Sequence, residues 1–269
     1  MRRIITCHAF AASVLLLIVA ADWRPAVAQT APASGGPVDA ALISDLVAGS
    51  RILAMEGVVD AYGHVSMRHP ANQSRYLMAR AVAPALVSAA DIMEFDLDSN
   101  PVDRQGRSMF LERFIHGEIY KARPDVNSVV HTHSPAIVPF SITQVPLKPI
   151  MHTTSFLWVG VPIWEIREAG GVTDMLVRNG MLGKSLAATL GDKPVALMRG
   201  HGNVVVGRNV QNAVRRAIYT EVNARLQTTA LQLGGPINYI SPEEGAMRDK
   251  SQADEARAWD LWKTRAMGK

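Results

Sequence analysis

The sequence predicts an α/β domain in which helices are layered on a sheet that is mixed or antiparallel. Segments with apolar residues at helical spacing alternate with short apolar runs along most of the chain. Two early strand-like runs, at 61–68 and 75–80, are joined by the polar residues 72–74, which indicates a hairpin. Because a hairpin makes its two strands antiparallel, the sheet is not expected to be purely parallel.

The first half of the chain continues this alternation. Residues 38–60 carry apolar residues at helical spacing, and Gly57 weakens the last turn. The strand-like run at 93–97 is interrupted by the turn at 98–101. A helix expected at 112–123 stops before Pro124, since proline cannot continue it.

The second half begins with an apolar strand at 126–132, after which Ser134 and Pro135 are the expected N-cap and first position of a helix. Two later helices end at glycine residues, and the last segment is mostly helical, with its tryptophans packed against the body. The remaining expected helices are 181–190, 210–233 and 243–267, and the remaining expected strands are 162–166, 194–198 and 204–206.

Composition describes a globular protein of one large domain. The chain has 269 residues, of which 48% are hydrophobic and 19% charged, enough to enclose a full core. The formal charge is +4, and lysine and arginine form no run longer than a pair. This pattern gives no indication of a nucleic-acid-binding protein.

The N-terminus has the pattern of a secretory signal peptide. Arg2 and Arg3 precede the apolar stretch 9–21, which is too short to span a bilayer, and Ala26-Val27-Ala28 is a small-residue cleavage site. We expect residues 1–28 to be removed after Ala28. The mature protein is then expected to be periplasmic or secreted, with no membrane attachment.

The mature chain would contain no cysteine, because the only one, Cys7, lies in the signal peptide. Disulfides and thiolate ligands are therefore excluded, and a bound metal would need histidine or carboxylate ligands. Residues 29–37 are small and rich in proline and glycine, so we expect a flexible tail there. The catalytic domain would occupy residues 38–269.

Three histidines and one glutamate stand at the ends of the expected elements. His131 and His133 are two residues apart in a strand, so their side chains point to the same face. His201 ends a second apolar run, and Glu112 opens a helix. Imidazole and carboxylate groups together suit a divalent metal. The alternatives are that Glu112 only interacts with the helix dipole, and that the histidines are ordinary core residues.

The chain resembles the class II aldolase/adducin family over roughly residues 40–235. The resemblance rests on segments 63–66, 112–116, 130–133 and 200–202, which follow in family order, with Glu112 and His131 19 residues apart. It implies a three-layer αβα sandwich around a central mixed, largely antiparallel sheet. It also implies a homotetramer with sites at subunit interfaces. One divalent metal per subunit would be held by His131, His133, His201 and Glu112.

Departures from the family pattern point away from sugar phosphates. Phe110 and Leu111 precede Glu112 where phosphate-handling members have small hydroxyl residues, and these side chains offer no hydrogen-bond donor. Arg80, in the loop after the second strand, has a guanidinium group that suits a carboxylate. We therefore expect Arg80, His64 and Ser66 to bind a small-molecule carboxylate.

Two proton-transfer residues are expected. Glu112 would move a proton, as a carboxylate beside the metal can. In some family members a tyrosine from the neighbouring subunit donates a proton, and His152 falls near that position. We therefore expect Glu112 and His152 to be the catalytic residues.

Residues 112–126 resemble decarboxylases of dihydroxyphthalate and of hydroxy-carboxymuconic semialdehyde. The expected function is thus a metal-dependent carbon–carbon lyase, a decarboxylase or aldolase, acting on a non-phosphorylated hydroxy or oxo carboxylic acid derived from an aromatic compound. The metal would act as a Lewis acid; zinc is expected, with manganese, cobalt and iron as alternatives. Iron-dependent oxygenases of hydroxyphenylpyruvate-like acids share the same resemblance, and a non-catalytic adducin-like binding module is a third possibility.

Overall fold

The computed structural model describes residues 30–250 and 255–268. The expected signal peptide, its cleavage site after Ala28 and Gln29 at the start of the expected tail lie outside these ranges. Within the described ranges, every helix is too short or too polar to cross a bilayer.

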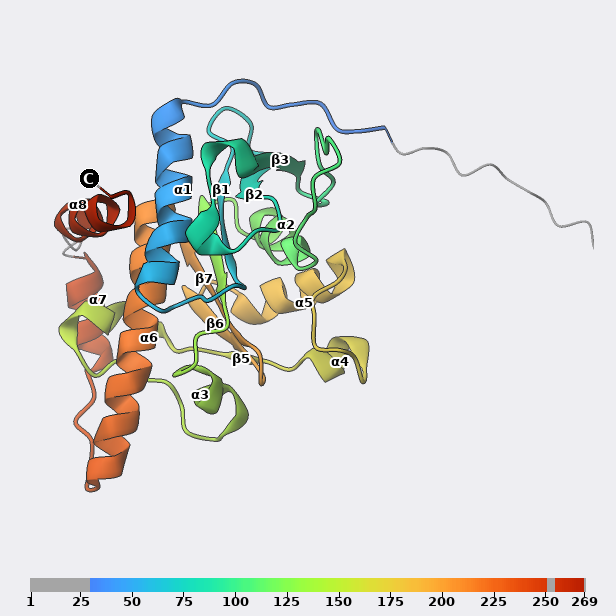
Figure 1. Cartoon of the computed structure of the whole chain (residues 1–269). Helices are drawn as coiled ribbons and strands as arrows, with labels where there is room; N and C mark the ends of the chain where they lie inside the picture. The colour runs from blue at the N-terminus through green and yellow to red at the C-terminus, as the bar shows by residue number, and fades with distance from the viewer. Residues whose placement is uncertain (1–29, 251–254, 269) are drawn as a thin grey trace, which may run out of the picture. The chain divides into compact units, whose positions relative to one another are not determined.

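A seven-stranded sheet forms the centre of the molecule, with the strand order β3-β2-β1-β4-β7-β6-β5 (Figure 1). Every neighbouring pair is antiparallel except β5 and β6. The expected mixed, largely antiparallel sheet, including the early hairpin, is therefore confirmed. The strands are β1 (His64–Arg68), β2 (Arg75–Ala79), β3 (Ile92–Asp96), β4 (Ser128–Thr132), β5 (Ile163–Trp164), β6 (Val195–Met198) and β7 (Gly202–Gly207).

Helices cover both faces of the sheet and complete the three layers (Figure 1). One face carries α1 (Ala40–Met55), α6 (Val210–Leu233) and α8 (Glu255–Ala266), and the other carries α2 (Arg113–Ala122) and α5 (Gly180–Leu190). Each side has its own hydrophobic core, because alternate strand residues point to opposite faces. Trp259 and Trp262 are buried in the first core, as expected.

The smaller elements include one departure from expectation. The expected helix start at Ser134 is wrong: its hydroxyl hydrogen-bonds the buried Glu221 instead of capping a helix, and α3 begins at Val138. The other short elements are α3 (Val138–Ile142), α4 (Ile166–Gly170), α7 (Pro242–Lys250), and the 3-10 helices η1 (Pro84–Leu86), η2 (Ala89–Asp91) and η3 (His152–Val159).

The segment before α1 forms neither helix nor strand, yet it is fastened to the sheet. The Gly35 amide and the Ser34 hydroxyl donate to the two carboxylate oxygens of Glu94, across 2.5 and 2.7 Å. His69 hydrogen-bonds the Gly36 carbonyl oxygen at 3.1 Å. These contacts involve residues 34–36 of the expected flexible tail, which itself stays a prediction.

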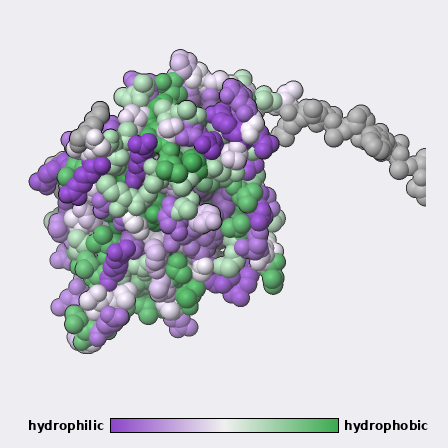
Figure 2. Space-filling view, viewed as in Figure 1, coloured by the Kyte–Doolittle hydropathy of each residue, from purple (hydrophilic) through white to green (hydrophobic). Residues whose placement is uncertain are grey.

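The end of α6 exposes hydrophobic side chains. Leu231 and Leu233 in its last turn are 43% and 82% exposed. Figure 2 shows hydrophobic surface at the lower end of the molecule, where α6 ends in Figure 1. Burial of such leucines against another surface would be favourable, at about 25 cal/mol per Å².

Candidate metal centre

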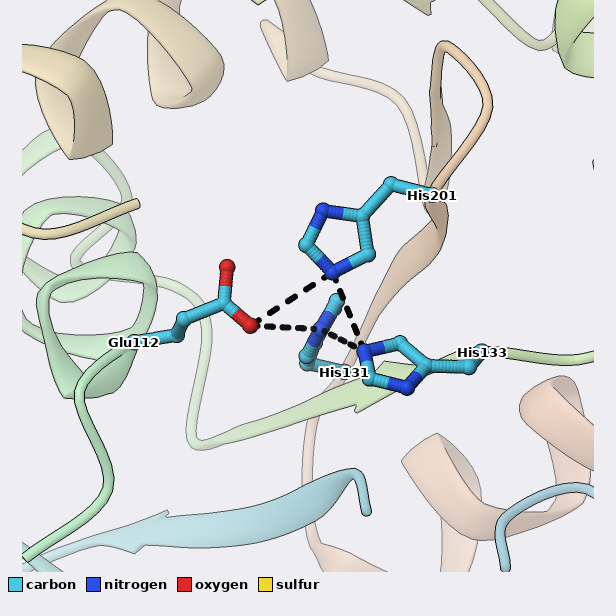
Figure 3. Close-up of side chains that lie close together, drawn as sticks. All are labelled: Glu112, His131, His133 and His201. Carbon is cyan, nitrogen blue, oxygen red and sulfur yellow. Dashed lines mark hydrogen bonds and ion pairs between the residues drawn. The ribbon is translucent and has the colours of Figure 1, made fainter. Parts of the chain in front are cut away.

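The structure brings Glu112, His131, His133 and His201 together, with one ligand atom from each lying within 4.8 Å of the others (Figure 3). The Nε2 atom of His133 lies 3.2 Å from Nε2 of His131 and 3.0 Å from Nε2 of His201. Oε2 of Glu112 lies 3.4 Å from Nε2 of both His131 and His201. Three imidazole nitrogens and one carboxylate oxygen converging on one point form a donor set that suits a divalent metal.

Sheet pairing explains why ligands so distant in sequence meet. His131 is the last residue but one of β4 and pairs with Val204 of β7, so the turn before β7 lies beside the end of β4. This close approach requires Gly202, because a Cβ atom there would collide with the Thr132 carbonyl group. His201, in that turn, is thereby placed next to the histidine pair.

Backbone carbonyl groups orient two of the imidazoles. Nδ1 of His131 lies 3.2 Å from the Asn203 carbonyl oxygen, and Nδ1 of His201 lies 3.0 Å from that of Met175. A carbonyl oxygen only accepts, so each Nδ1 carries a proton, and in the neutral ring each Nε2 keeps a lone pair directed at the cluster. This is the tautomer that metal binding through Nε2 requires.

Glu112 is held at the same point by a backbone amide. Its Oε1 accepts a hydrogen bond from the Val177 N–H at 2.9 Å, which leaves Oε2 facing the histidines. Burial works to raise the pKa of Glu112, but His131 and His201 outweigh it and hold that pKa well below its usual range. The carboxyl group is therefore ionised. Glu112 is the N-cap residue of α2, but its side chain makes no capping hydrogen bond and faces the histidines instead.

A cavity of about 380 Å³ opens beside Glu112 and His133. Its lining is almost entirely apolar or aromatic, and no lysine or arginine belongs to it. Tyr62, 65% exposed, contributes a phenol ring whose centroid is 6.1 Å from that of His133. The other lining residues are Ala61, Gly63, His64, Ala81, Val82, Ala83, Met109, Phe110, Leu111 and Leu176.

Of the three expected substrate contacts, only His64 lines this cavity. Ser66 is fully buried, and its hydroxyl is bonded to His116 and Tyr120, so it lies behind the site and not in it. Arg80 is outside the lining, because its guanidinium pairs with Asp91 at 2.5 Å. The structure therefore places Ser66 and Arg80 outside this cavity, and their role as substrate contacts stays a prediction that this geometry does not support.

His152 lies away from the cluster of its own chain. It is exposed at the start of η3, which packs on α6 and α7, whereas the cluster lies on the side of the sheet covered by α2 and α5. A role for His152 as proton donor would thus require a neighbouring subunit, and it stays a prediction.

Sequence reasoning missed the segment between α4 and α5. Met175 supplies its carbonyl oxygen to His201, and Val177 supplies its amide to Glu112. Met175 has a φ of +69°, a strained conformation for a residue other than glycine. Because both contributions are backbone groups, no residue type marks them in the sequence.

Comparison with known proteins agrees with this geometry. The decarboxylase tropJ of Talaromyces stipitatus is 36% identical over 244 residues, covering 82% of this chain and 92% of that protein. A 3,4-dihydroxyphthalate decarboxylase of Arthrobacter keyseri is 32% identical over 226 residues, covering 78% and 83%. An L-fuculose 1-phosphate aldolase of Glaciozyma antarctica PI12 has the same fold, with a TM-score of 0.71 at 23% identity over 87% of this chain and 95% of that one.

The family described as "Class II Aldolase and Adducin N-terminal domain" matches residues 44–228. This range contains all four members of the cluster and the whole sheet. The chain therefore belongs to the class II aldolase and adducin family.

Proposed function

We propose that this protein is a divalent-metal-dependent decarboxylase of a hydroxylated aromatic carboxylic acid without phosphate, with 3,4-dihydroxyphthalate as the first candidate. The chain is a lyase by its family and by its decarboxylase relatives. The observation that carries the substrate class is the apolar cavity that lies directly against the cluster of histidines and Glu112.

The cavity suits an aromatic ring with oxygen substituents at one end. Val82, Phe110 and Leu176 offer apolar contact to a ring, while Glu112 and His133 border the same space. A phosphate group would need convergent cationic or N–H donors, and the lining offers no lysine or arginine side chain. The walls therefore favour an aromatic carboxylate over a sugar phosphate.

The same walls favour loss of carbon dioxide. A carboxylate placed against them loses hydration without gaining a cationic partner, whereas the departing carbon dioxide is neutral and loses little. A divalent metal, when bound by the cluster, would supply Lewis-acid stabilisation of the negative charge left on the substrate. Glu112, ionised and hydrogen-bonded to Val177, is suited to holding the metal.

Zinc is the metal that we propose, since three imidazoles and one carboxylate are ligands that it commonly takes. Manganese, cobalt and iron accept the same ligands. An iron-dependent oxygenase would consume oxygen, and a decarboxylase of this kind would not. The metal and the requirement for oxygen therefore separate the two reactions.

The test is turnover of 3,4-dihydroxyphthalate by protein loaded with zinc, manganese, cobalt or iron(II), with and without oxygen. We expect one equivalent each of carbon dioxide and 3,4-dihydroxybenzoate, at the same rate in both atmospheres. Turnover that requires both iron(II) and oxygen would instead establish the oxygenase. Protein that binds none of these metals would be consistent with a binding module.

We also propose export and assembly. Export rests on the pattern of residues 1–28 and would be tested by sequencing the N-terminus of protein recovered from cell fractions, with Gln29 as the expected first residue. A homotetramer is supported by the family resemblance and by the exposed Leu231 and Leu233. Light scattering during size-exclusion chromatography would measure the mass.

A further inference from the structure

A chain of four buried polar side chains leads from the cavity wall into the core beneath α2. His64 Nδ1 lies 2.7 Å from His116 Nε2, His116 Nδ1 lies 2.6 Å from Ser66 Oγ, and Ser66 Oγ lies 2.7 Å from the hydroxyl oxygen of Tyr120. Ser66 and His116 are fully buried, and Tyr120 is 1% exposed. Only His64 reaches the cavity.

The position of each proton in this hydrogen-bonded series follows from Tyr120, which lies at its inner end. Within the described residues, Ser66 Oγ is the hydrogen-bond partner of the Tyr120 hydroxyl. Ser66 Oγ is then the acceptor open to the Tyr120 proton, and a buried donor without an acceptor is costly. Tyr120 therefore donates to Ser66, and Ser66 must donate to His116 Nδ1.

The two imidazoles continue the same direction of hydrogen-bond donation toward the cavity. His116 accepts at Nδ1, so as a neutral ring it carries its proton on Nε2 and donates to His64 Nδ1. Burial lowers the pKa of His116 to about 3, which keeps it neutral near pH 7. His64 accepts at Nδ1 in turn, so its own proton is on Nε2.

His64 Nε2 is on the cavity side of the ring. Nδ1 points inward to His116, and the two nitrogens of an imidazole face away from each other, so Nε2 points outward. Among the described residues, none hydrogen-bonds His64 Nε2. The buried polar atoms that lack a partner do not include it either, so Nε2 is not a buried atom without a partner. With its proton in place it cannot be a metal ligand, which agrees with its absence from the cluster.

We propose that the chain Tyr120–Ser66–His116 fixes His64 as a neutral Nε2–H donor, and that this donor binds an acceptor oxygen of the substrate beside the metal centre. The substrate part of this statement rests on the proposed function; the fixed tautomer does not. His64 then selects a carboxylate, carbonyl or phenolate oxygen over a donor-only group such as a protonated amine. His116, Ser66 and Tyr120 are positioning residues that act through His64.

The hydrogen-bonded series from Tyr120 to His64 holds a proton in place and does not deliver one. Passing a net proton outward would leave a phenolate at Tyr120, and burial raises the pKa of that phenol above its ordinary range. His64 is therefore a hydrogen-bond donor in the ground state as well as during the reaction.

The decisive experiment is ¹⁵N–¹H correlation NMR of zinc-loaded full-length mature protein labelled in its histidines, with His64 assigned by its loss in His64→Gln. We expect protonated Nε2 and unprotonated Nδ1 for His64. Ser66→Ala and Tyr120→Phe should make the Nδ1–H form of His64 visible.

The matched control is Tyr76→Phe. It removes a buried hydroxyl that hydrogen-bonds Ser99, outside the hydrogen-bonded series, and should leave the tautomer of His64 unchanged. A proton on Nδ1 in the unmodified protein, or an unchanged tautomer in both chain variants, would overturn the proposal.

Binding separates this inference from the proposed function. We expect Tyr120→Phe to weaken binding of 3,4-dihydroxybenzoate by up to about tenfold at unchanged zinc content, the larger the fraction of the population that presents no donor. Tyr76→Phe should bind it normally. If the tautomer is fixed as described but 3,4-dihydroxyphthalate is not turned over, the proposed function fails while the fixed donor stands. Equal affinity in Tyr120→Phe and the unmodified protein would remove the substrate contact.

Discussion

The backbone amide of Val177 donates to Oε1 of Glu112 across 2.9 Å and thereby divides the carboxylate into a structural oxygen and a free one. Val177 is fully buried, so the contact is protected from water. Oε2 is left facing His131 and His201. A loop that contains no metal-binding residue thus sets the direction of the one anionic ligand.

Glu112→Gln should preserve the fold and weaken the metal site. The amide oxygen can still accept from Val177, but an uncharged NH₂ group would replace Oε2. We expect zinc affinity to fall by more than about tenfold, since even indirect contacts to a metal contribute that much. Competition with a chelator measures it. Glu118→Gln on the same helix is the control, and equal affinities in the two variants would remove Glu112 from the ligand set.

Arg80→Ala should leave the KM for a carboxylate substrate unchanged. Its guanidinium is paired with Asp91, outside the cavity, and its side chain is 38% exposed. We expect a loss of at most about 1 kcal/mol in the free energy of unfolding, as for other partly exposed ion pairs. Steady-state kinetics and urea unfolding measure both effects. A KM raised tenfold or more would return Arg80 to the substrate site.

Filling the cavity should block the reaction and spare the metal. Leu176→Trp places a larger side chain in the space proposed for the aromatic ring. We expect kcat/KM to fall at least about tenfold, because overpacking a closed wall costs of the order of 1–3 kcal/mol. Zinc content should not change. The control is Val172→Trp, at a site that is 98% exposed; unimpaired turnover in Leu176→Trp would place the substrate elsewhere.

The metal-free protein should lose stability on acidification from about pH 6.5. Burial lowers the pKa of His116 to about 3, and burial with His131 and His201 lowers that of His133 to about 4. Unfolded histidines titrate near 6.5, so between these values the unfolded state binds more protons and gains relative stability. Each such histidine contributes about 1.4 kcal/mol per pH unit over that window.

Urea unfolding of the metal-free protein at pH 7.5, 5.5 and 4.5 measures this dependence. His116→Gln should flatten it, whereas His152→Gln, at an exposed position, should not. A free energy of unfolding that is constant over this range would mean that His116 and His133 are not held neutral.

Local rules located the elements that carry the cluster. The two-residue period of a strand placed His131 and His133 on one face, and the structure bears this out. The helix predicted at 210–233 has those bounds because Asn209 caps its start and Gly234 ends it. Such features depend only on residues that are near one another in the sequence, so the sequence alone predicts them.

The placements that the sequence did not predict depend on contacts that only the folded chain creates. Ser66 and His64 share one face of β1, but only tertiary packing decides that His64 meets the cavity while Ser66 meets α2. The guanidinium group of Arg80 could bind a carboxylate by its chemistry, but in the folded chain it pairs with Asp91. The chemistry of a side chain predicts which groups it can bind, but the packing of the folded chain determines which of them it contacts.

The pairing of β4 with β7 makes ion retention a measure of the global fold. Glu112 and His201 are 89 positions apart and come together only when this pairing and the docking of α2 are complete. An unfolded chain would have no such cluster, so an ion bound to the folded form stabilises it by mass action. Loss of the ion would accordingly accompany unfolding, and cells short of the metal would hold a less durable protein.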